Sequence, residues 1–349
     1  MEFLCGATLR LNAGCRIRLT SQIVQQMARA RRTMAAFKWF RIVLVLSAAI
    51  LGCEDNSPQP VPAPRYISSF GTWGNDDGEM EYPYGIAIGP DSLLYIGDTG
   101  NRRVDVFSKN GAFVRQWPTE EAPWTIVAAP DSTIYVNLHP SHNRPFGPGI
   151  RRYTPDGQPL ETFNFVNVVG GMEVDQSGNF YVCGLRVYGP DPLHQFVDGP
   201  YFWKFNSQWQ LVKKWGYPGA QDTTGWFARG MTWNPKGNLV AFGQIGSATA
   251  VFEFTPDGQS VSARQIPYLE LDKLEDITCD LSGRLLISDP YTELVYMLDS
   301  RGSFLNQWNE TNENHEPLKR PAGLAVDANG LLYVVDFGRY EIVKFDLSH

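Results

Sequence analysis

Cysteine, histidine and long apolar runs are scarce in this chain of 349 residues. Of its five cysteines, only Cys183 and Cys279 lie beyond residue 53, and they fall in different copies of the repeat described below. We therefore expect buried free thiols and no disulfide framework. The apolar run Ile42–Leu51 is about ten residues long, about half of what a helix needs to cross a bilayer.

Motifs of the common hydrolases, redox proteins and nucleotide-binding proteins are also missing. The chain has no G-x-S-x-G, no C-x-x-C and no glycine-rich phosphate loop. His315 and Glu316 begin an H-E pair, but the second histidine of a zinc-protease helix is absent. The acidic run Asn75–Glu79 lacks EF-hand spacing, so we expect a turn there.

Basic charge is scarce outside the N-terminal segment. Of the 30 Lys and Arg residues eight lie within residues 1–52, and of the 37 Asp and Glu residues only Glu2 does. Residues 53–349 therefore carry 22 basic and 36 acidic side chains, a net charge of −14. A field of that sign repels phosphate backbones, so nucleic acid is not an expected partner.

The N-terminal part has the order of an export signal. From Met27 a basic segment precedes the apolar run, which ends in Ile50-Leu51-Gly52-Cys53. This end resembles the bacterial lipobox, in which a small residue precedes a cysteine that becomes lipidated and N-terminal after cleavage, although Leu51 departs from the usual pattern. An ordinary signal peptide, or an uncleaved anchor with an incidental cysteine, is the alternative. The resemblance implies lipidation at Cys53 and an exported, membrane-anchored protein on the periplasmic or cell-surface side.

Four segments follow from this order. Residues 1–26 precede a complete signal, and a start codon placed too far upstream explains them. Residues 27–52 form the signal peptide. Residues 53–65 contain the lipidated cysteine and a proline-rich linker that would hold the folded part away from a membrane. Residues 66–349 form the folded domain.

Short apolar runs separated by turn signals fill the folded domain, and no stretch of helical period intervenes. Tyr82–Trp117 contains four such runs, and the pattern recurs in six copies at intervals of about 40 to 60 residues. The turns that follow the first run of each copy begin at Asp91, Asp131, Asp175, Asn234, Asp280 and Asp327. Four strands per copy at this period predict an all-β, six-bladed β-propeller with four-stranded antiparallel blades.

The sixth copy ends after its third run, Glu341–Phe345. Tyr66–Gly74 resembles the fourth runs of other copies, such as those that end in Trp117 and Trp308. We therefore predict that this N-terminal segment pairs with Glu341–Phe345 and closes the ring, because closure removes the free edges of an open array. The expected propeller is monomeric.

The first and last copies resemble NHL repeats. The resemblance rests on Pro83–Ala87 leading to Leu94–Val104, and on Pro321–Asp327 leading to Leu332–Asp336. Copies two to five keep the strand pattern but lose the Asp-x-x-Asn-x-Arg segment. NHL proteins form six-bladed propellers and include binding modules and some enzymes, so the resemblance specifies the fold better than the function. It implies that Asp98, Asn101 and Arg103 form a structural network at the exit of the second strand.

Three long connections are predicted to share one face of the propeller, because links from strand four to the next blade and from strand two to strand three lie on the same side. They are Leu138–Gly149, Leu185–Pro200 and Tyr217–Arg229. Long loops on a rigid scaffold commonly carry recognition, and aromatic residues with arginine are typical anchors. The candidate ligand-binding residues on these connections are His139, His142, Arg144, Arg186, Tyr188, His194, Trp226 and Arg229.

A metal-dependent enzyme is the alternative. Six-bladed relatives include a lyase with histidine-bound zinc and lactonases that bind a divalent cation at the axis, so zinc or calcium is the metal this alternative requires. Glu275 and Asp276 precede a first strand and could face the axis, which makes them further candidates. Two carboxylates are fewer than a metal site usually needs. We expect no catalytic residues, no metal and no cofactor.

The sequence thus favours a lipid-anchored, exported NHL-type propeller that acts as a non-catalytic binding or scaffold module at the cell envelope. Its expected partner is an envelope protein, a peptide or a glycan. The alternative function is that of a metal-dependent lyase or lactonase of the six-bladed type.

Overall fold

The structure is a computed structural model that describes residues 8–10, 16–18, 61–139, 149–163, 168–188, 196–216, 229–245, 248–310 and 316–348. For residues 168, 185–188, 196–200 and 229 it describes the backbone only. The chain divides into two compact units, Met1–Gln59 and Pro60–His349. In the first unit, β1 (Thr8–Arg10) pairs antiparallel with β2 (Arg16–Arg18).

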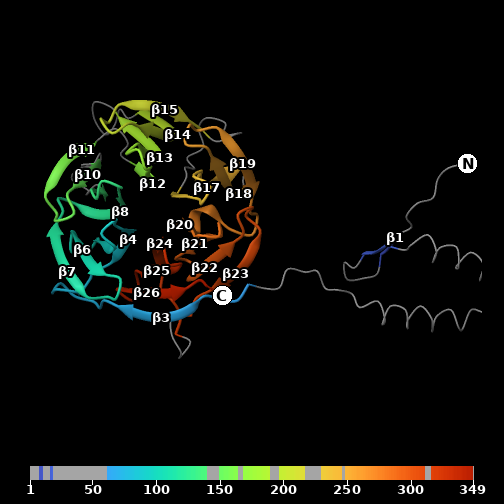
Figure 1. The fold of residues 1–349 in the computed structure, drawn as a ribbon, viewed down its shortest axis with the longest axis horizontal. Helices are drawn as coiled ribbons and strands as arrows, with labels where there is room; N and C mark the ends of the chain where they lie inside the picture. The colour runs from blue at the N-terminus through green and yellow to red at the C-terminus, as the bar shows by residue number, and fades with distance from the viewer. Residues whose placement is uncertain are drawn as a thin grey trace, which may run out of the picture. The chain divides into compact units, whose positions relative to one another are not determined.

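The second unit is a six-bladed β-propeller, as predicted, with six four-stranded antiparallel sheets around one axis (Figure 1). The first strands of blades one to six are β4 (Pro83–Ile88), β8 (Ala122–Ala128), β12 (Val168–Val174), β16 (Arg229–Trp233), β20 (Ile277–Cys279) and β24 (Pro321–Val326). The second strands are β5 (Leu93–Asp98), β9 (Ile134–His139), β13 (Phe180–Tyr188), β17 (Leu239–Ile245), β21 (Leu285–Asp289) and β25 (Leu331–Asp336). The third strands are β6 (Arg103–Ser108), β10 (Gly149–Tyr153), β14 (Phe196–Phe205), β18 (Ala248–Phe254), β22 (Leu294–Leu298) and β26 (Glu341–Asp346). The fourth strands are β7 (Phe113–Pro118), β11 (Pro159–Phe163), β15 (Leu211–Trp215), β19 (Ser260–Gln265), β23 (Phe304–Trp308) and, for blade six, β3 (Arg65–Phe70).

The N-terminal strand closes the ring. β3 pairs antiparallel with β26, with Tyr66 opposite Phe345 and Phe70 opposite Ile342, which confirms the predicted closure. The strand is shorter than predicted, because it ends at Phe70 and the chain then turns toward blade one. It also begins within the predicted linker, and the carbonyl of Val61 accepts a hydrogen bond from Asn306 Nδ2 at 2.7 Å. The last linker residues are therefore held against blade five.

The hydrophobic core is a ring of six clusters, each between two neighbouring blades. Second and third strands are buried on both faces, because each blade is covered by a neighbour on either side. Fourth strands are the most exposed of each blade and form the outer wall. A cluster of this kind exists only when both blades are in place, so the blades stabilise one another.

A recurring polar contact joins adjacent blades. In blades one, three and six a cationic side chain lies over a second-strand tyrosine and donates a hydrogen bond to a carbonyl of the next blade's turn between strands three and four. The three pairs are Arg115 with Pro155 O, Lys204 with Pro256 O, and Lys344 with Lys109 O. These contacts fix the register between blades.

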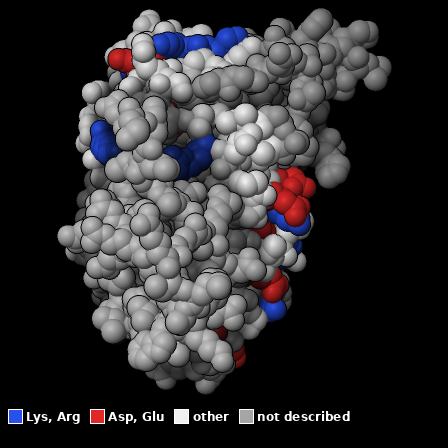
Figure 2. All heavy atoms as spheres, turned by 90° about the vertical axis from the view of Figure 1, so that its right-hand side faces the viewer, with Lys and Arg blue, Asp and Glu red and all other residues white. Residues whose placement is uncertain are grey.

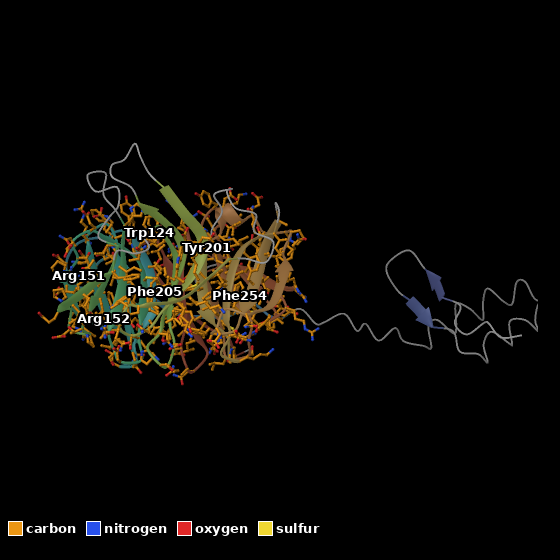
Figure 3. The ribbon with its side chains drawn as sticks, turned by 90° about the horizontal axis from the view of Figure 1, so that it is seen from above. Trp124, Arg151, Arg152, Tyr201, Phe205 and Phe254 are labelled. Carbon is orange, nitrogen blue, oxygen red and sulfur yellow. The ribbon has the colours of Figure 1, made fainter. Side chains whose placement is uncertain are left out.

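Two faces of the propeller differ. We call the face that carries the links from strand two to strand three, and from strand four to the next blade, the connection face. The opposite face carries the turns within each hairpin of strands one and two and of strands three and four. Blade three extends furthest on the connection face, where the predicted loop Leu185–Pro200 instead continues the hairpin of β13 and β14 through the pair Tyr188 and Phe196 (Figure 3). The prediction of a loop there was wrong, because the β-branched and aromatic residues at both ends of this segment favour strand pairing.

Among the described residues, no helix is long and apolar enough to cross a membrane. The one helix described is the 3₁₀ turn η2 (Leu271–Lys273). Along the right-hand edge of Figure 2, described acidic and basic side chains lie next to one another.

Candidate functional site: the axial cavity and the connection face

A cavity of about 220 Å³ lies on the propeller axis, lined by the first strands of all six blades. In each strand the residues at positions i and i+2 point the same way, so two layers of side chains face the axis. The upper layer consists of Gly85, Thr125, Gly171, Gly230 and Asp276, which line the cavity, and of Gly323 at the equivalent position of blade six. The lower layer consists of Ala87, Val127, Glu173, Thr232, Thr278 and Ala325.

Asp276 occupies a position that is glycine in four of the six blades. Those glycines are required because neighbouring first strands approach closely: a Cβ added to Gly323 would collide with the backbone of blade one. Asp276 fits because it lies directly before β20, and its carboxylate accepts hydrogen bonds from the amide of Ile277 and the amide of Leu324 in blade six, both at 2.8 Å. The side chain is therefore fixed at the axis by two donors.

Glu173 brings a second carboxyl group into the cavity from blade three. Both acids lie deep in the protein and keep only a little accessible surface. Burial, together with the charge of Asp276, raises the pKa of Glu173 to about 8. Burial also raises the pKa of Asp276 to about 7, although the amides of Leu324 and Ile277 act in the opposite direction. The three threonine hydroxyls are the remaining polar side-chain groups of the lining, which contains no Lys or Arg among the described residues.

An aromatic row crosses the connection face of blades six, one and two. It consists of Tyr340, Tyr82, Phe337, Tyr84, Trp124 and His139. Successive ring centroids lie 5.5, 5.2, 6.1, 4.5 and 4.4 Å apart. Figure 3 shows Trp124 on the same side of the propeller as the projecting hairpin of blade three.

The backbone of this row is strained. Tyr82 and Tyr340 have φ of +52° and +60°, and Arg320, whose guanidinium lies 4.7 Å from the ring centroid of Phe337, has φ of +64°. Residues other than glycine rarely adopt this region, which costs on the order of 1 kcal/mol or more for each residue. Tyr82 is 43% exposed although its ring contacts two others, those of Phe337 and Tyr340. Such strain is typical of surfaces where the exact direction of a side chain matters.

The structure describes the side chains of three of the predicted site residues, His139, Glu275 and Asp276. His139 ends β9, is exposed and packs against the ring of Trp124, so it belongs to the aromatic row. Asp276 lines the axial cavity, whereas Glu275 is not among the lining residues, and its amide donates to the carbonyl of Ser288. That these residues bind a ligand stays a prediction.

The other candidates are only partly described. Arg186 and Tyr188 lie in the β13 extension and Arg229 begins β16, and for these three the backbone alone is described. The remaining candidates lie outside the described residues: His142, Arg144, His194, Trp226 and the predicted lipidation site Cys53.

Sequence reasoning missed Glu173 and most of the aromatic row. A signal for Glu173 was present, since Gly171-Met172-Glu173-Val174 places an acid where the other copies have alanine, valine or threonine. The aromatic row had no such signal, because its members come from three blades, and its contacts between blades six and one form only when the ring closes. Among the described residues, no group of three or more His, Cys, Asp or Glu side chains could hold a metal ion.

The comparison with protein families identifies the repeat type of the last blade. The family model of the NHL repeat matches residues 318–345, which contain β24, β25 and most of β26. Residues 318–345 form an NHL repeat. The resemblance predicted from Pro321–Asp336 is therefore confirmed, and the chain is a six-bladed propeller that contains an NHL repeat.

Solved structures share this fold at low sequence identity. A gluconolactonase from Xanthomonas campestris superposes with a TM-score of 0.54 and 15% identity, covering 82% of this chain and 99% of that one. The virginiamycin B lyase of Staphylococcus aureus gives a TM-score of 0.53 and 13% identity, covering 79% and 84%. At this identity the likeness shows the fold alone.

Mouse teneurin-1 is 24% identical to the chain over 227 residues. The match covers 60% of this chain but only 7% of the length of teneurin-1. It relates the propeller to one small part of a much larger protein.

Proposed function

We propose that this protein is a non-catalytic binding module, held at the cell envelope by a lipid on Cys53, that recognises an envelope protein, peptide or glycan through its connection face. The observation that carries the proposal is the aromatic row, in which ring contacts and strained backbone together fix six exposed or half-exposed rings on one face. Tyrosine and tryptophan at rigid surface positions contribute most of the binding energy at many interfaces.

Further exposed aromatics lie on the same face. Trp73, in the connection from β3 to β4, is 64% exposed, and Tyr291, in the link from β21 to β22, is 70% exposed. Large exposed apolar side chains that gather on one face mark interaction surfaces more often than single scattered ones do. Their distribution supports recognition by the connection face of blades five, six and one.

The position of the first strand suits a tether. β3 begins at Arg65, which pairs with Asp346 at the end of β26, on the face opposite the connection face. A tether that enters at Arg65 therefore joins the propeller on the face opposite the connection face. The likeness to lactonases and lyases shows the fold alone, so it does not carry an activity for this chain.

Two measurements test the proposal. The intact mass of protein extracted from membranes should correspond to a lipidated chain that begins at Cys53, and an unmodified N-terminus upstream of Cys53 would rule the anchor out. For recognition, a photo-crosslinking residue is placed in turn at Tyr82, Trp124 and Phe304. Phe304 is the control, because at 48% exposed it matches Tyr82 but lies on the outer wall.

Crosslinked products specific to positions 82 and 124 are the expected result. The partner must then be lost from purified complexes when Tyr82 or Trp124 is replaced by alanine, whereas F304A retains it. Equal products from all three positions, or retention of the partner by the Y82A and W124A proteins, would show that the connection face is not the recognition surface.

A further inference from the structure

The axial cavity has the chemistry of a site for a cation. Two carboxyl groups reach it from blades three and five, and three threonine hydroxyls surround them at Thr125, Thr232 and Thr278. The rest of the lining is glycine, alanine and larger aliphatic residues. A mostly apolar cavity with a few convergent polar groups is the usual form of a small-molecule site.

The protein itself supplies little to stabilise the carboxyl group of Glu173 in this cavity. Its carboxyl group is buried, and the amide of Val174 is the one hydrogen-bond donor that acts on it among the described residues. A carboxylate has about four acceptor positions, and Glu173 lines the cavity, so a donor bound there can use the remaining positions. Burying a second acid beside Asp276 costs free energy unless a proton or a cation compensates the charge.

The geometry disfavours a resident metal ion. Calcium takes six to eight oxygen ligands, and zinc takes three or four protein ligands. The two carboxyl groups lie in different layers of the cavity and on blades that are not neighbours, and no group of three suitable side chains occurs among the described residues. An ammonium group, in contrast, needs separate acceptors in different directions, because each of its N–H bonds donates to one oxygen.

We propose that the axial cavity binds a small organic ligand through its protonated amine, with Asp276 and Glu173 as the two anionic acceptors and the threonine hydroxyls as further acceptors. The aliphatic lining then contacts the carbon part of the ligand. The cavity volume of about 220 Å³ accommodates a head group of a few carbon and nitrogen atoms but no polymer. This site is independent of the aromatic row, so either can fail without the other.

The test uses the purified propeller with n-butylammonium as the probe and n-butanol as its neutral counterpart of similar shape. Binding is followed by the shift of the melting temperature and by calorimetry. At about pH 8.5 n-butylammonium should raise the melting temperature in a saturable way, and n-butanol should not. The E173Q and D276N proteins should bind the probe at least about tenfold more weakly, whereas E161Q, which removes an exposed acid on the outer wall, should bind it as the parent does.

The affinity should also fall as the pH is lowered from about 8.5 to about 6, because the cation must displace protons from the two acids. The titratable groups concerned are Glu173, Asp276 and Glu275, whose charge acts on Asp276; β4, β8, β16 and β24 contribute no titratable side chain to the described lining.

Three outcomes would overturn the proposal. Equal stabilisation by n-butanol would show an apolar cavity site in which charge plays no part. Stoichiometric binding of calcium or zinc that E173Q and D276N abolish, without binding of n-butylammonium, would assign the pair to a metal. No saturable effect of n-butylammonium at concentrations in the tens of millimolar would leave the two acids as structural groups.

Discussion

Gly157 in blade two lies directly against the indole ring of Trp117 in blade one. A Cβ atom added to Gly157 would lie 2.5 Å from Cγ and Cδ2 of that ring. The same contact joins Gly111 to Phe70 and Gly258 to Trp215. In three of the six blades, an aromatic residue of the fourth strand thus packs against a glycine in a turn of the next blade.

We predict that G157A lowers the free energy of unfolding by about 2–4 kcal/mol, because the new methyl group meets the Trp117 ring and φ is +87°. Gly237 is the matched control: its φ is +75°, but nothing lies within 4 Å of an added Cβ. G237A should cost only about 1–2 kcal/mol, the cost of the backbone conformation. Denaturant unfolding of the two variants measures the difference, and equal losses would show that the contact with the indole does not matter.

The strand pattern made the fold predictable from the sequence, and the aligned turns located every blade. The closing strand was predictable for the same reason, since Tyr66–Phe70 has the pattern of a fourth strand without a third strand before it. The β13 extension was not predictable, because Gly189 and the prolines near it signal a loop while Leu185–Tyr188 favour a strand. The pairing of Tyr188 with Phe196 in the folded protein favours the strand over the loop.

The candidate site was harder to predict than the fold. Asp276 could be expected at the axis because of its place before a first strand. Glu173 follows glycine and methionine in an apparently apolar run, and only the registers of the strand pairs show that it shares a layer with Ala87 and Thr232. The aromatic row depends on the approach of Tyr82 to Tyr340, two residues at opposite ends of the domain that ring closure brings together.

Ring closure itself should dominate the stability of the propeller. Deletion of residues 66–74 removes β3 and exposes the edge of β26 together with the apolar cluster between blades six and one. We expect a loss of several kcal/mol and a much lower melting temperature. Deletion of residues 54–60, which precede the described segment at Val61, is the control and should leave the melting temperature almost unchanged. An unaltered melting temperature after removal of β3 would mean that blade six is stable with three strands.

Arg103 should be irreplaceable by lysine. Its Nε donates to Asp98 at 2.8 Å and lies 3.1 Å from Asp105, while its two terminal nitrogens donate to the carbonyls of Asn75 and Glu79. This network was predicted from Asp98, Asn101 and Arg103, and the hydrogen bonds confirm it. It also fixes the acidic turn of residues 75–79.

A lysine has one nitrogen and cannot reach all four partners, so R103K should lower the free energy of unfolding by about 2–4 kcal/mol. The control is R65K, at an exposed ion pair with Asp346, which should change stability by no more than the error of the measurement. If R103K unfolds at the same denaturant concentration as the parent, the fork geometry of the guanidinium is not required.

The buried acids predict an unusual pH dependence of stability. Burial and the neighbouring charge of Asp98 raise the pKa of Asp105 to about 8, and burial raises the pKa of Asp336 to about 7. Glu173 and Asp276 are raised in the same way, to about 8 and about 7. In the unfolded chain these groups lose their protons near pH 4. The folded protein therefore holds more protons than the unfolded chain between about pH 4 and about pH 8.

Stability must fall as the pH rises through that range, because the state that binds more protons is favoured at lower pH. Each such group contributes a slope of at most about 1.4 kcal/mol per pH unit. The carboxyl groups with lowered pKa values, such as Asp131 and Asp175, act in the opposite sense, but only below about pH 4. Melting temperatures recorded from pH 5 to about pH 8.5 measure the slope. D105N and E173Q should each make it shallower, because amides do not titrate, whereas a parent protein whose stability increases across this range would contradict the protonated state of these buried acids.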